Sequence, residues 1–207
     1  MSNYIIGSGG HCRSVIKILL QKFSKDELQI IDLSNEKLDK SIMGIEVSDI
    51  KDINLLKNKV NTNIYCAIGD NSIRGKYLQL ARKLGFKTPS LVSKNSSIDS
   101  SAQILQGTFI GDFTYVGPKV VLGLDCIVNT GSIVEHETVV KDRCQISPNA
   151  TICGRCIINE NSFIGAGATI IDKIQIAPFT KIGAGATVIK NIRVGNLTWV
   201  GTPVKQI

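Results

Sequence analysis

A six-residue repeat occupies the second half of the chain and constrains its fold more than any other feature. From residue 98 onward, every sixth position carries a branched aliphatic side chain, without an insertion. These positions are Ile98, Ile104, Ile110, Val116, Leu122, Val128, Val134, Val140, Ile146, Ile152, Ile158, Ile164, Ile170, Ile176, Ile182, Val188, Val194 and Val200. The residue four positions after each of them is small or β-branched. A fixed short period indicates a repeat architecture, and a hexapeptide period indicates a parallel β-helix.

The spacing also predicts which side chains form the interior. Alternate residues of a strand share a face, so the aliphatic residue and the small residue two positions before it both point inward. The two residues between strands turn a corner, and three hexapeptides close a triangular coil. The repeat therefore predicts about six stacked coils that bury one continuous core. Glycine often follows the aliphatic residue, where we expect it to supply special backbone angles; these glycines are Gly111, Gly117, Gly123, Gly165, Gly183, Gly195 and Gly201.

The first ninety residues follow another pattern, in which short apolar runs alternate with helical periodicity. Strands are expected at residues 4–6, 29–33, 44–47 and 64–68. Helices are expected at residues 11–23, 52–60 and 72–84. This alternation predicts a small, Rossmann-like α/β domain at residues 1–90. The β-helix domain then comprises residues 91–207.

A glycine-rich turn, Gly7-Ser8-Gly9-Gly10, lies between the first expected strand and helix. A helix N-terminus in this setting offers free N–H groups and a positive dipole end to a phosphate. The dinucleotide fingerprint needs a third glycine where Cys12 stands, so the match is partial and a plain tight turn remains an alternative. Asp32 ends the second expected strand. It could bind a ribose hydroxyl or simply lie on the surface, and the sequence leaves both open.

Composition limits the possible partners. The net charge of +7 comes without a Lys/Arg run and with 5% aromatic residues, so we expect phosphorylated small molecules and not nucleic acid as ligands. No stretch is apolar enough for a membrane span, and the first residues lack the basic and apolar regions of a signal peptide. Cys153 and Cys156 form a C-x-x-C pair, but a second pair for zinc and a βαβ context for redox chemistry are both missing. We expect free thiols in a reducing cytoplasm and, with the two histidines in different domains, no metal site.

Three motifs accompany the repeat. They are Gly7-Ser8-Gly9-Gly10-His11, Asn129-Thr130-Gly131-Ser132 followed by Glu135-His136-Glu137, and Gly201-Thr202-Pro203. Through them the whole chain resembles the bacterial sugar acetyltransferases of the PglD/NeuD type, within the left-handed hexapeptide acyltransferases. The resemblance implies a left-handed β-helix, acetyl-CoA as co-substrate, and a homotrimer with the coenzyme between neighbouring prisms. It also implies that the small domain holds a nucleotide-linked sugar through Gly7, Gly9, Gly10, His11 and Asp32.

His136 is the candidate general base. Coil geometry places it on a corner, and its neighbour Glu137 stacks between Lys119 and Arg155 at a spacing of eighteen residues. A surface corner with a charge ladder would explain these residues without any catalysis. An imidazole titrates near neutral pH, however, and can accept the proton that an attacking amine or hydroxyl loses. Glu137 or Glu135 would orient it, and the sequence does not decide between the two.

The coenzyme residues are expected at glycine corners. Gly154 lies one coil after His136, and the family uses a backbone amide at the matching position to stabilise the oxyanion. The pairs Gly165-Ala166 and Gly183-Ala184 are eighteen residues apart and leave a smooth edge for a pantetheine arm. Tight corner packing explains these small residues equally well.

The sequence therefore favours an acetyl-CoA-dependent N-acetyltransferase that acts on a UDP-, dTDP- or GDP-linked 4-amino sugar for bacterial surface glycans. Direct transfer is expected, because no nucleophile is evident beside His136. One alternative is a sialic acid O-acetyltransferase. Another is a non-catalytic structural or carbohydrate-binding β-helix. The His136 motif favours an enzyme, and the glycine turn favours a nucleotide sugar over sialic acid.

Overall fold

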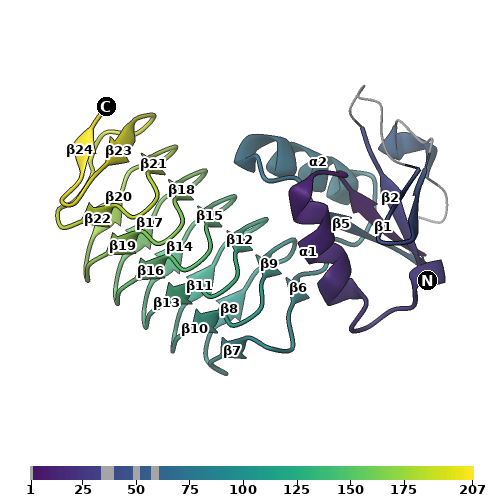
Figure 1. Cartoon of the computed structure of the whole chain (residues 1–207), viewed down its shortest axis with the longest axis horizontal. Helices are drawn as coiled ribbons and strands as arrows, with labels where there is room; N and C mark the ends of the chain where they lie inside the picture. The colour runs from purple at the N-terminus through teal and green to yellow at the C-terminus, as the bar shows by residue number, and fades with distance from the viewer. Residues whose placement is uncertain (1, 34–39, 49–51, 57–60) are drawn as a thin grey trace. The chain divides into compact units, whose positions relative to one another are not determined.

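The computed structural model describes residues 2–33, 40–48, 52–56 and 61–207. The chain divides into two compact units, Met1–Leu91 and Val92–Ile207. The first is an α/β unit and the second a β-helix (Figure 1). Among the described residues, none of the helices has the length and apolar character that crossing a membrane requires.

The N-terminal unit is built on a sheet with the strand order β3-β4-β2-β1-β5. Its strands are β1 (Ser2–Ile6), β2 (Leu28–Ile31), β3 (Ser41–Ile42), β4 (Ile45–Ser48) and β5 (Thr62–Cys66). All pair in parallel except the edge strand β3, which is antiparallel to β4. The helices are α1 (Gly10–Leu19) and α2 (Asn71–Lys83), with short 3₁₀ turns at Lys25–Glu27 and Ile53–Leu55. The order of strands and helices gives the parallel α/β class that the alternating pattern predicts.

The apolar residues of this unit cluster where sheet and helices meet. Ile5, Ile6 and Ile30 are fully buried, and α1 buries the face predicted from its spacing, including Val15 and Ile16. The turn before α2 provides a cap, because the Asp70 carboxylate accepts a hydrogen bond of 2.8 Å from the amide of Ile73. Both helices therefore begin at defined positions at the ends of β1 and β5.

The helix predicted at residues 52–60 is not formed as expected. The chain makes only the 3₁₀ turn Ile53–Leu55, in which the Asp52 carboxylate accepts from the amide of Asn54 at 2.8 Å. This bond caps the start of the turn, and the extended backbone of Leu56 ends it after one turn. Residues 57–60 of the predicted helix lie outside the described residues.

The second unit is a solenoid with three parallel sheets (Figure 1). The first sheet contains β7 (Ser97–Ile98), β10 (Tyr115–Val116), β13 (Ile133–Val134), β16 (Thr151–Ile152), β19 (Thr169–Ile170) and β22 (Thr187–Val188). The second contains β8 (Gln103–Ile104), β11 (Val121–Leu122), β14 (Val139–Val140), β17 (Ile157–Ile158) and β20 (Gln175–Ile176). The third contains β6 (Leu91–Val92), β9 (Phe109–Ile110), β12 (Ile127–Val128), β15 (Gln145–Ile146), β18 (Phe163–Ile164), β21 (Lys181–Ile182), β23 (Thr198–Val200) and β24 (Lys205–Gln206).

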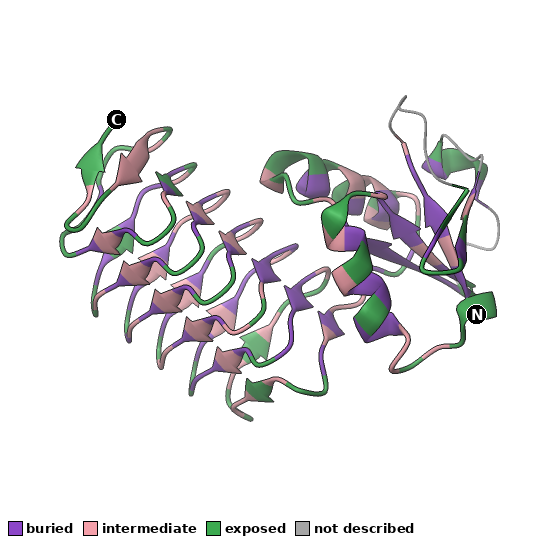
Figure 2. Cartoon of the chain, in the orientation of Figure 1, coloured by how far each residue is buried: buried purple, intermediate pink, exposed green. Residues whose placement is uncertain are grey.

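Residues eighteen apart are paired, as Val116 with Val134 and Val134 with Ile152. The repeated aliphatic residues from Ile110 to Val188 are fully buried, as the spacing predicts; Figure 2 shows this buried inner side of the coils. Polar side chains among the inward-facing residues form hydrogen bonds with backbone carbonyl groups. The Thr138 hydroxyl, for example, donates to the carbonyl of Cys153 at 3.0 Å. Stacking thus produces one core along the solenoid axis.

The stack of six equal coils that we expected is too simple, because the three sheets have six, five and eight strands. The third sheet gains β6 before the repeat and the antiparallel strand β24 at its end. The last turn is also shortened. Ile192 pairs with Ile176 where Val194 was expected, and Val194 is 63% exposed. Trp199 then takes the place of Val200 opposite Ile182 and packs on the core.

The expected role of the repeated glycines is also corrected. Of the glycines that follow the aliphatic residue, only Gly201 has a positive φ. They are required because the coils stack closely: a Cβ at Gly165 would lie 2.6 Å from the amide nitrogen of Ala184, and one at Gly111 would lie 2.8 Å from that of Thr130. The left-handed conformation occurs two residues later, at corner positions such as Lys119.

Candidate active site

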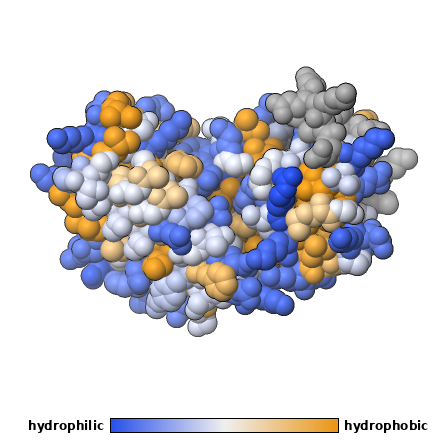
Figure 3. All heavy atoms as spheres, in the orientation of Figure 1, coloured by the Kyte–Doolittle hydropathy of each residue, from blue (hydrophilic) through white to orange (hydrophobic). Residues whose placement is uncertain are grey.

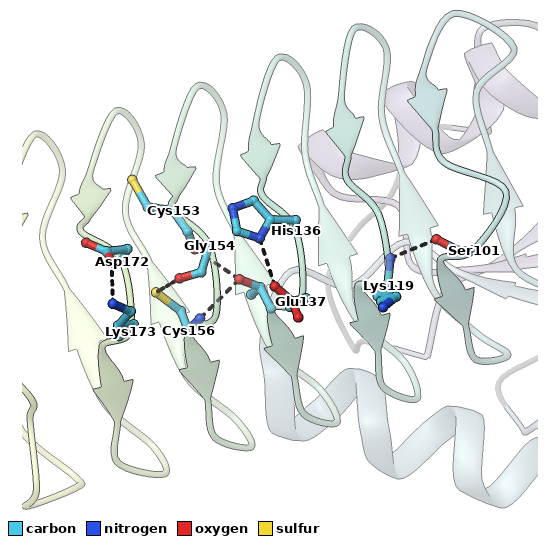
Figure 4. Close-up of polar contacts among 10 residues, drawn as sticks. Ser101, Lys119, His136, Glu137, Cys153, Gly154, Cys156, Asp172 and Lys173 are labelled. Atoms are coloured by element: carbon cyan, nitrogen blue, oxygen red, sulfur yellow. Dashed lines mark hydrogen bonds and ion pairs between the residues drawn. The ribbon is translucent and has the colours of Figure 1, made fainter.

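His136 and Glu137 form the corner between β13 and β14 (Figure 4). Glu137 has the left-handed backbone conformation, with φ of 60°. The backbone of this corner is tied to both neighbouring coils, because the Glu137 amide donates to the carbonyl of Pro118 at 2.8 Å and the His136 carbonyl accepts from the amide of Arg155 at 2.9 Å. The stacking therefore fixes the position from which the imidazole projects.

The imidazole is oriented by its neighbour. Nδ1 of His136 lies 3.2 Å from Oε2 of Glu137, and the two side chains are 44% and 49% exposed. A carboxylate at Nδ1 favours the tautomer with its proton there, which leaves Nε2 as a proton acceptor. Within the part of the chain that the structure describes, Glu135 makes no hydrogen bond to His136. Of the two candidate carboxylates, the geometry favours Glu137.

Gly154 lies directly against the imidazole on the next coil (Figure 4). A Cβ at this position would lie 2.5 Å from both Cε1 and Nε2 of His136. The Gly154 carbonyl accepts from the amide of Lys173 at 2.9 Å, whereas its own N–H donates no hydrogen bond to any described residue. The corner thus combines a proton acceptor, Nε2, with a neighbouring backbone donor, which is the combination that acyl transfer requires.

The charge ladder that the sequence suggested at this corner is not formed by contacts. Among the described residues, neither Lys119 nor Arg155 makes an ion pair with Glu137. The next cation of the column, the Lys173 ammonium, lies 3.7 Å from the Asp172 carboxylate. Glu137 is therefore directed to the imidazole and not to the cations of its column.

The nearest thiol is poorly suited to be a nucleophile. Cys153 precedes Gly154 and is partly exposed, and burial, followed by the charges of Asp172 and Glu135, raises its pKa. A thiol with a raised pKa remains protonated at neutral pH and reacts slowly. The described residues contain no group of three or more His, Cys, Asp or Glu side chains placed to hold a metal ion.

The two glycine–alanine pairs lie at a different corner of the solenoid. Gly165 and Ala166 follow β18, and Gly183 and Ala184 follow β21. Both pairs therefore come after strands of the third sheet, whereas His136 comes after a strand of the first. They stack on each other, with the amide of Gly185 donating to the carbonyl of Ala166 at 2.8 Å. Ala166 and Ala184 are exposed. One chain therefore does not bring this edge and His136 together.

The N-terminal unit contains a pocket of about 600 Å³ at the glycine turn. Its lining includes all five residues expected to hold a nucleotide sugar, namely Gly7, Gly9, Gly10, His11 and Asp32. It also includes Ser8, Leu33, Ala67, Ile68, Gly69, Ile73 and Tyr77, which sequence reasoning did not assign. The added side chains are mostly apolar, so the lining combines the polar glycine turn with an apolar wall.

The glycines of this turn differ in their roles. Gly7 has φ of 102°, and a Cβ there would lie 2.8 Å from Cγ1 of Ile68, so a side chain is excluded. Gly9 and Gly10 have open space around the Cβ position. Gly9 is the N-cap of α1 and provides no side-chain cap, so no side chain of the N-cap residue competes with a ligand at this helix N-terminus.

Three polar side chains, those of Ser8, Asp32 and His11, belong to the pocket lining. The Ser8 hydroxyl donates to the carboxylate of Asp32, which is buried. Burial, and to a smaller extent the charge of Arg74, lowers the pKa of His11 to about 4. His11 is therefore a neutral imidazole at neutral pH. Ser8 stands inside the glycine motif, and that position was the only sequence signal for its role.

Comparison with known proteins gives the same division. The family model described as the PglD N-terminal domain matches residues 4–80. The model of the bacterial transferase hexapeptide (six repeats) matches residues 137–172. The first match covers the glycine turn and the pocket, and the second begins at the corner of His136.

Several solved structures are similar over the whole chain. The acetyltransferase domain of PglB from Neisseria gonorrhoeae FA1090 is 30% identical, with a TM-score of 0.89 and coverage of 100% of this chain and 99% of that chain. The same domain has been solved in complex with acetyl coenzyme A. Perosamine N-acetyltransferase from Caulobacter crescentus, solved with CoA and GDP-perosamine, is 25% identical, with a TM-score of 0.90 and coverage of 100% and 97%. WeeI from Acinetobacter baumannii AYE is 25% identical, with a TM-score of 0.89 and coverage of 100% of both chains.

Proposed function

The chain belongs to the hexapeptide-repeat sugar acetyltransferases of the left-handed β-helix family, and we propose that it transfers the acetyl group of acetyl-CoA to the amino group of a nucleotide-linked 4-amino sugar. The observation that carries this proposal is the corner at which Nδ1 of His136 meets Glu137 and the ring lies against Gly154. A non-catalytic β-helix would not need this arrangement. The similar enzyme from Caulobacter, solved with CoA and GDP-perosamine, supports the substrate class.

The reaction is a direct acyl transfer. Nε2 of His136 accepts a proton from the sugar amine as its nitrogen attacks the thioester carbonyl, and the carbonyl oxygen becomes an oxyanion. The Gly154 N–H donates to that oxyanion. When the intermediate collapses, the carbon–sulfur bond breaks and the imidazolium returns the proton to the sulfur of coenzyme A. Glu137 stabilises the imidazolium between the two proton transfers.

The N-terminal unit has the features that suit a nucleotide. We propose that residues 1–90 hold the nucleotide-linked sugar and that residues 91–207 carry out the transfer. The N-terminus of α1 and its glycine turn suit the diphosphate, and Asp32 suits a ribose hydroxyl. A free sialic acid has neither a diphosphate nor a ribose. The cysteines are free thiols, which is consistent with a reaction in the cytoplasm.

The acceptor is tested by supplying acetyl-CoA with UDP-, dTDP- and GDP-linked 4-amino sugars and, separately, with sialic acid and CMP-sialic acid. Mass spectrometry then identifies the product that gains an acetyl group. We expect acetylation of at least one amino sugar and hardly any of the sialic acids. Efficient acetylation of the sialic acids alone would establish O-acetylation in its place.

Glu137→Gln is expected to lower turnover by less than the roughly hundredfold expected for removal of the imidazole, because the carboxylate orients the ring and does not take the proton. Steady-state kinetics with saturating acetyl-CoA measure the effect. Glu135→Gln is the matched control, since Glu135 adjoins the same histidine without bonding to it, and it should stay within about twofold of the unmodified protein. A larger loss from Glu135→Gln than from Glu137→Gln would reverse the assignment.

A homotrimer is the expected assembly. Similar enzymes bind coenzyme A, and the glycine–alanine edge lies at a different corner from His136, so neighbouring subunits would combine the two in one site. On the face shown in Figure 3, the β-helix carries small hydrophobic patches among hydrophilic residues. Its exposed corners include the large side chains of Phe113 and Phe179. Light scattering on the purified protein should give three times the mass of the 22.4 kDa chain; a monomer at working concentration would contradict the assembly.

A further inference from the structure

Arg74 lies in the first half of α2 and is almost completely buried, with 1% of its surface exposed. Its Nη1 donates to the carbonyl oxygens of Ile68 and Gly69 at 3.2 Å and 2.9 Å. Its Nη2 donates to Oδ1 of Asn71 at 2.7 Å. A buried guanidinium costs considerable desolvation energy. Its position against the loop at residues 68–71 therefore calls for a function.

The loop that Arg74 holds is one wall of the pocket. Ile68 and Gly69 line it together with the glycine turn. The side chain of Ile68 packs so closely on Gly7 that a Cβ there would lie 2.8 Å from it. Any shift of the loop would therefore change the distance between the apolar wall and the phosphate-binding turn. The two hydrogen bonds from Arg74 to the carbonyl oxygens of Ile68 and Gly69 oppose such a shift.

The charge of Arg74 also reaches into the pocket. His11 lines the pocket at the N-terminus of α1, and the positive charge of Arg74 contributes, after burial, to the lowered pKa of His11. A potential that disfavours a proton on that imidazole favours an anion at the same place. The N-termini of α1 and α2 both contribute residues to this lining, and their dipoles have the same sign.

We propose that Arg74 is a positioning residue for the nucleotide: it fixes the 68–69 wall of the pocket and provides the buried positive charge that balances the diphosphate. This inference rests on the proposed function, because it takes the glycine-turn pocket as the nucleotide site. The guanidinium acts from beneath the wall and need not touch the ligand. Its contribution therefore depends on the phosphates of the ligand and not on the sugar or the acetyl group.

The test compares Arg74→Gln and Arg74→Lys with the unmodified chain and with Arg82→Gln. Arg82 is a matched control, because it lies on the same helix, donates to Thr88 Oγ1 at 3.2 Å and does not line the pocket. Calorimetry measures the binding of UDP, dTDP and GDP and of the corresponding nucleosides. Arg74→Gln should weaken the binding of the best diphosphate by about tenfold or more and of its nucleoside by less than about threefold. Arg82→Gln should change neither.

Kinetics and nuclear magnetic resonance supply readouts that a purely structural role would not move. In Arg74→Gln the KM for the nucleotide sugar should rise, while the KM for acetyl-CoA and kcat at saturating sugar stay the same. The pKa of His11 should also rise, because a neighbouring cation has been removed. Equal weakening of nucleoside and diphosphate, or an unchanged pKa of His11, would overturn the inference.

Two further results separate the possible failures. If the unmodified chain binds none of the nucleotides, the proposed function is wrong; if it binds a diphosphate and Arg74→Gln binds it equally well, only the role of Arg74 is wrong. If Arg74→Gln does not fold, the binding of diphosphate and nucleoside is measured with Arg74→Lys. This variant keeps the charge and should keep the preference for diphosphate, and loss of that preference would contradict the inference. In the unmodified chain, the bound diphosphate should raise the pKa of His11, and a constant pKa would also contradict the inference.

Discussion

Replacement of His136 by alanine is expected to lower turnover at least about a hundredfold, because it removes the proton acceptor from the acyl transfer. The side chain projects from a corner, is 44% exposed, and takes no part in the core. The melting temperature should therefore hardly change. Measurement of free thiol release from acetyl-CoA, with the preferred amino sugar at saturation, gives kcat, and circular dichroism checks the fold.

The control for His136→Ala is Asp172→Ala, two coils further along the same edge, where an exposed carboxylate lies 3.7 Å from the ammonium of the neighbouring Lys173. It should retain almost full activity. Near-native turnover in His136→Ala would remove His136 from the mechanism. A similar loss in Asp172→Ala would show that any change at this edge is harmful.

Gly154→Ala should be nearly as damaging, although it adds only a methyl group. That group would lie 2.5 Å from Cε1 and Nε2 of His136, so the imidazole must move away. A displacement of about 1 Å at a reacting group costs about a hundredfold in rate. The backbone itself need not change, because Gly154 does not have a positive φ. We expect kcat to fall about a hundredfold with little change in the KM for the sugar.

The double variant distinguishes a displaced base from a damaged backbone. In a His136→Ala background no ring remains to be pushed aside, so Gly154→Ala should have little additional effect and the two losses should be far from additive. Additive losses would mean that the alanine acts on the Gly154 amide or on coenzyme binding, and not through His136.

The interior of the β-helix could be predicted because its period is visible in the residues themselves. Ile110 to Val188 are buried as their spacing requires. The pattern of aliphatic residues continues to Val200, but the backbone leaves the period earlier: Ile192 replaces Val194, and Trp199 replaces Val200. A sequence period specifies which side chains are apolar, whereas the path of the last turn depends on how the end of the core is covered.

The candidate site was predictable as far as its motifs extend. His136 and the residues of the glycine turn could be selected from sequence, and the structure gathers the latter in one pocket. The partner of His136 could not be chosen, because Glu135 and Glu137 flank it equally in the chain. The choice depends on the left-handed backbone of Glu137, which is not encoded in the residue type. The wall contributed by Ile68 and Tyr77 depends on the packing of β5 and α2, elements far from the glycine turn in sequence.

The left-handed corner recurs with almost the same φ at Lys119, Glu137, Arg155 and Lys173, whatever the side chain. Such a scaffold accepts exchanges at its corners without a new backbone, so a catalytic pair could in principle be moved by one coil. What makes one coil different is the residue stacked next to it. A histidine in place of Gly154, one coil further on, would meet Asp172 on the following coil, where His136 meets a glycine. Relocation of the catalytic centre by one coil would therefore require three coordinated exchanges, at positions 154, 155 and 172, and a single substitution would not create a second site.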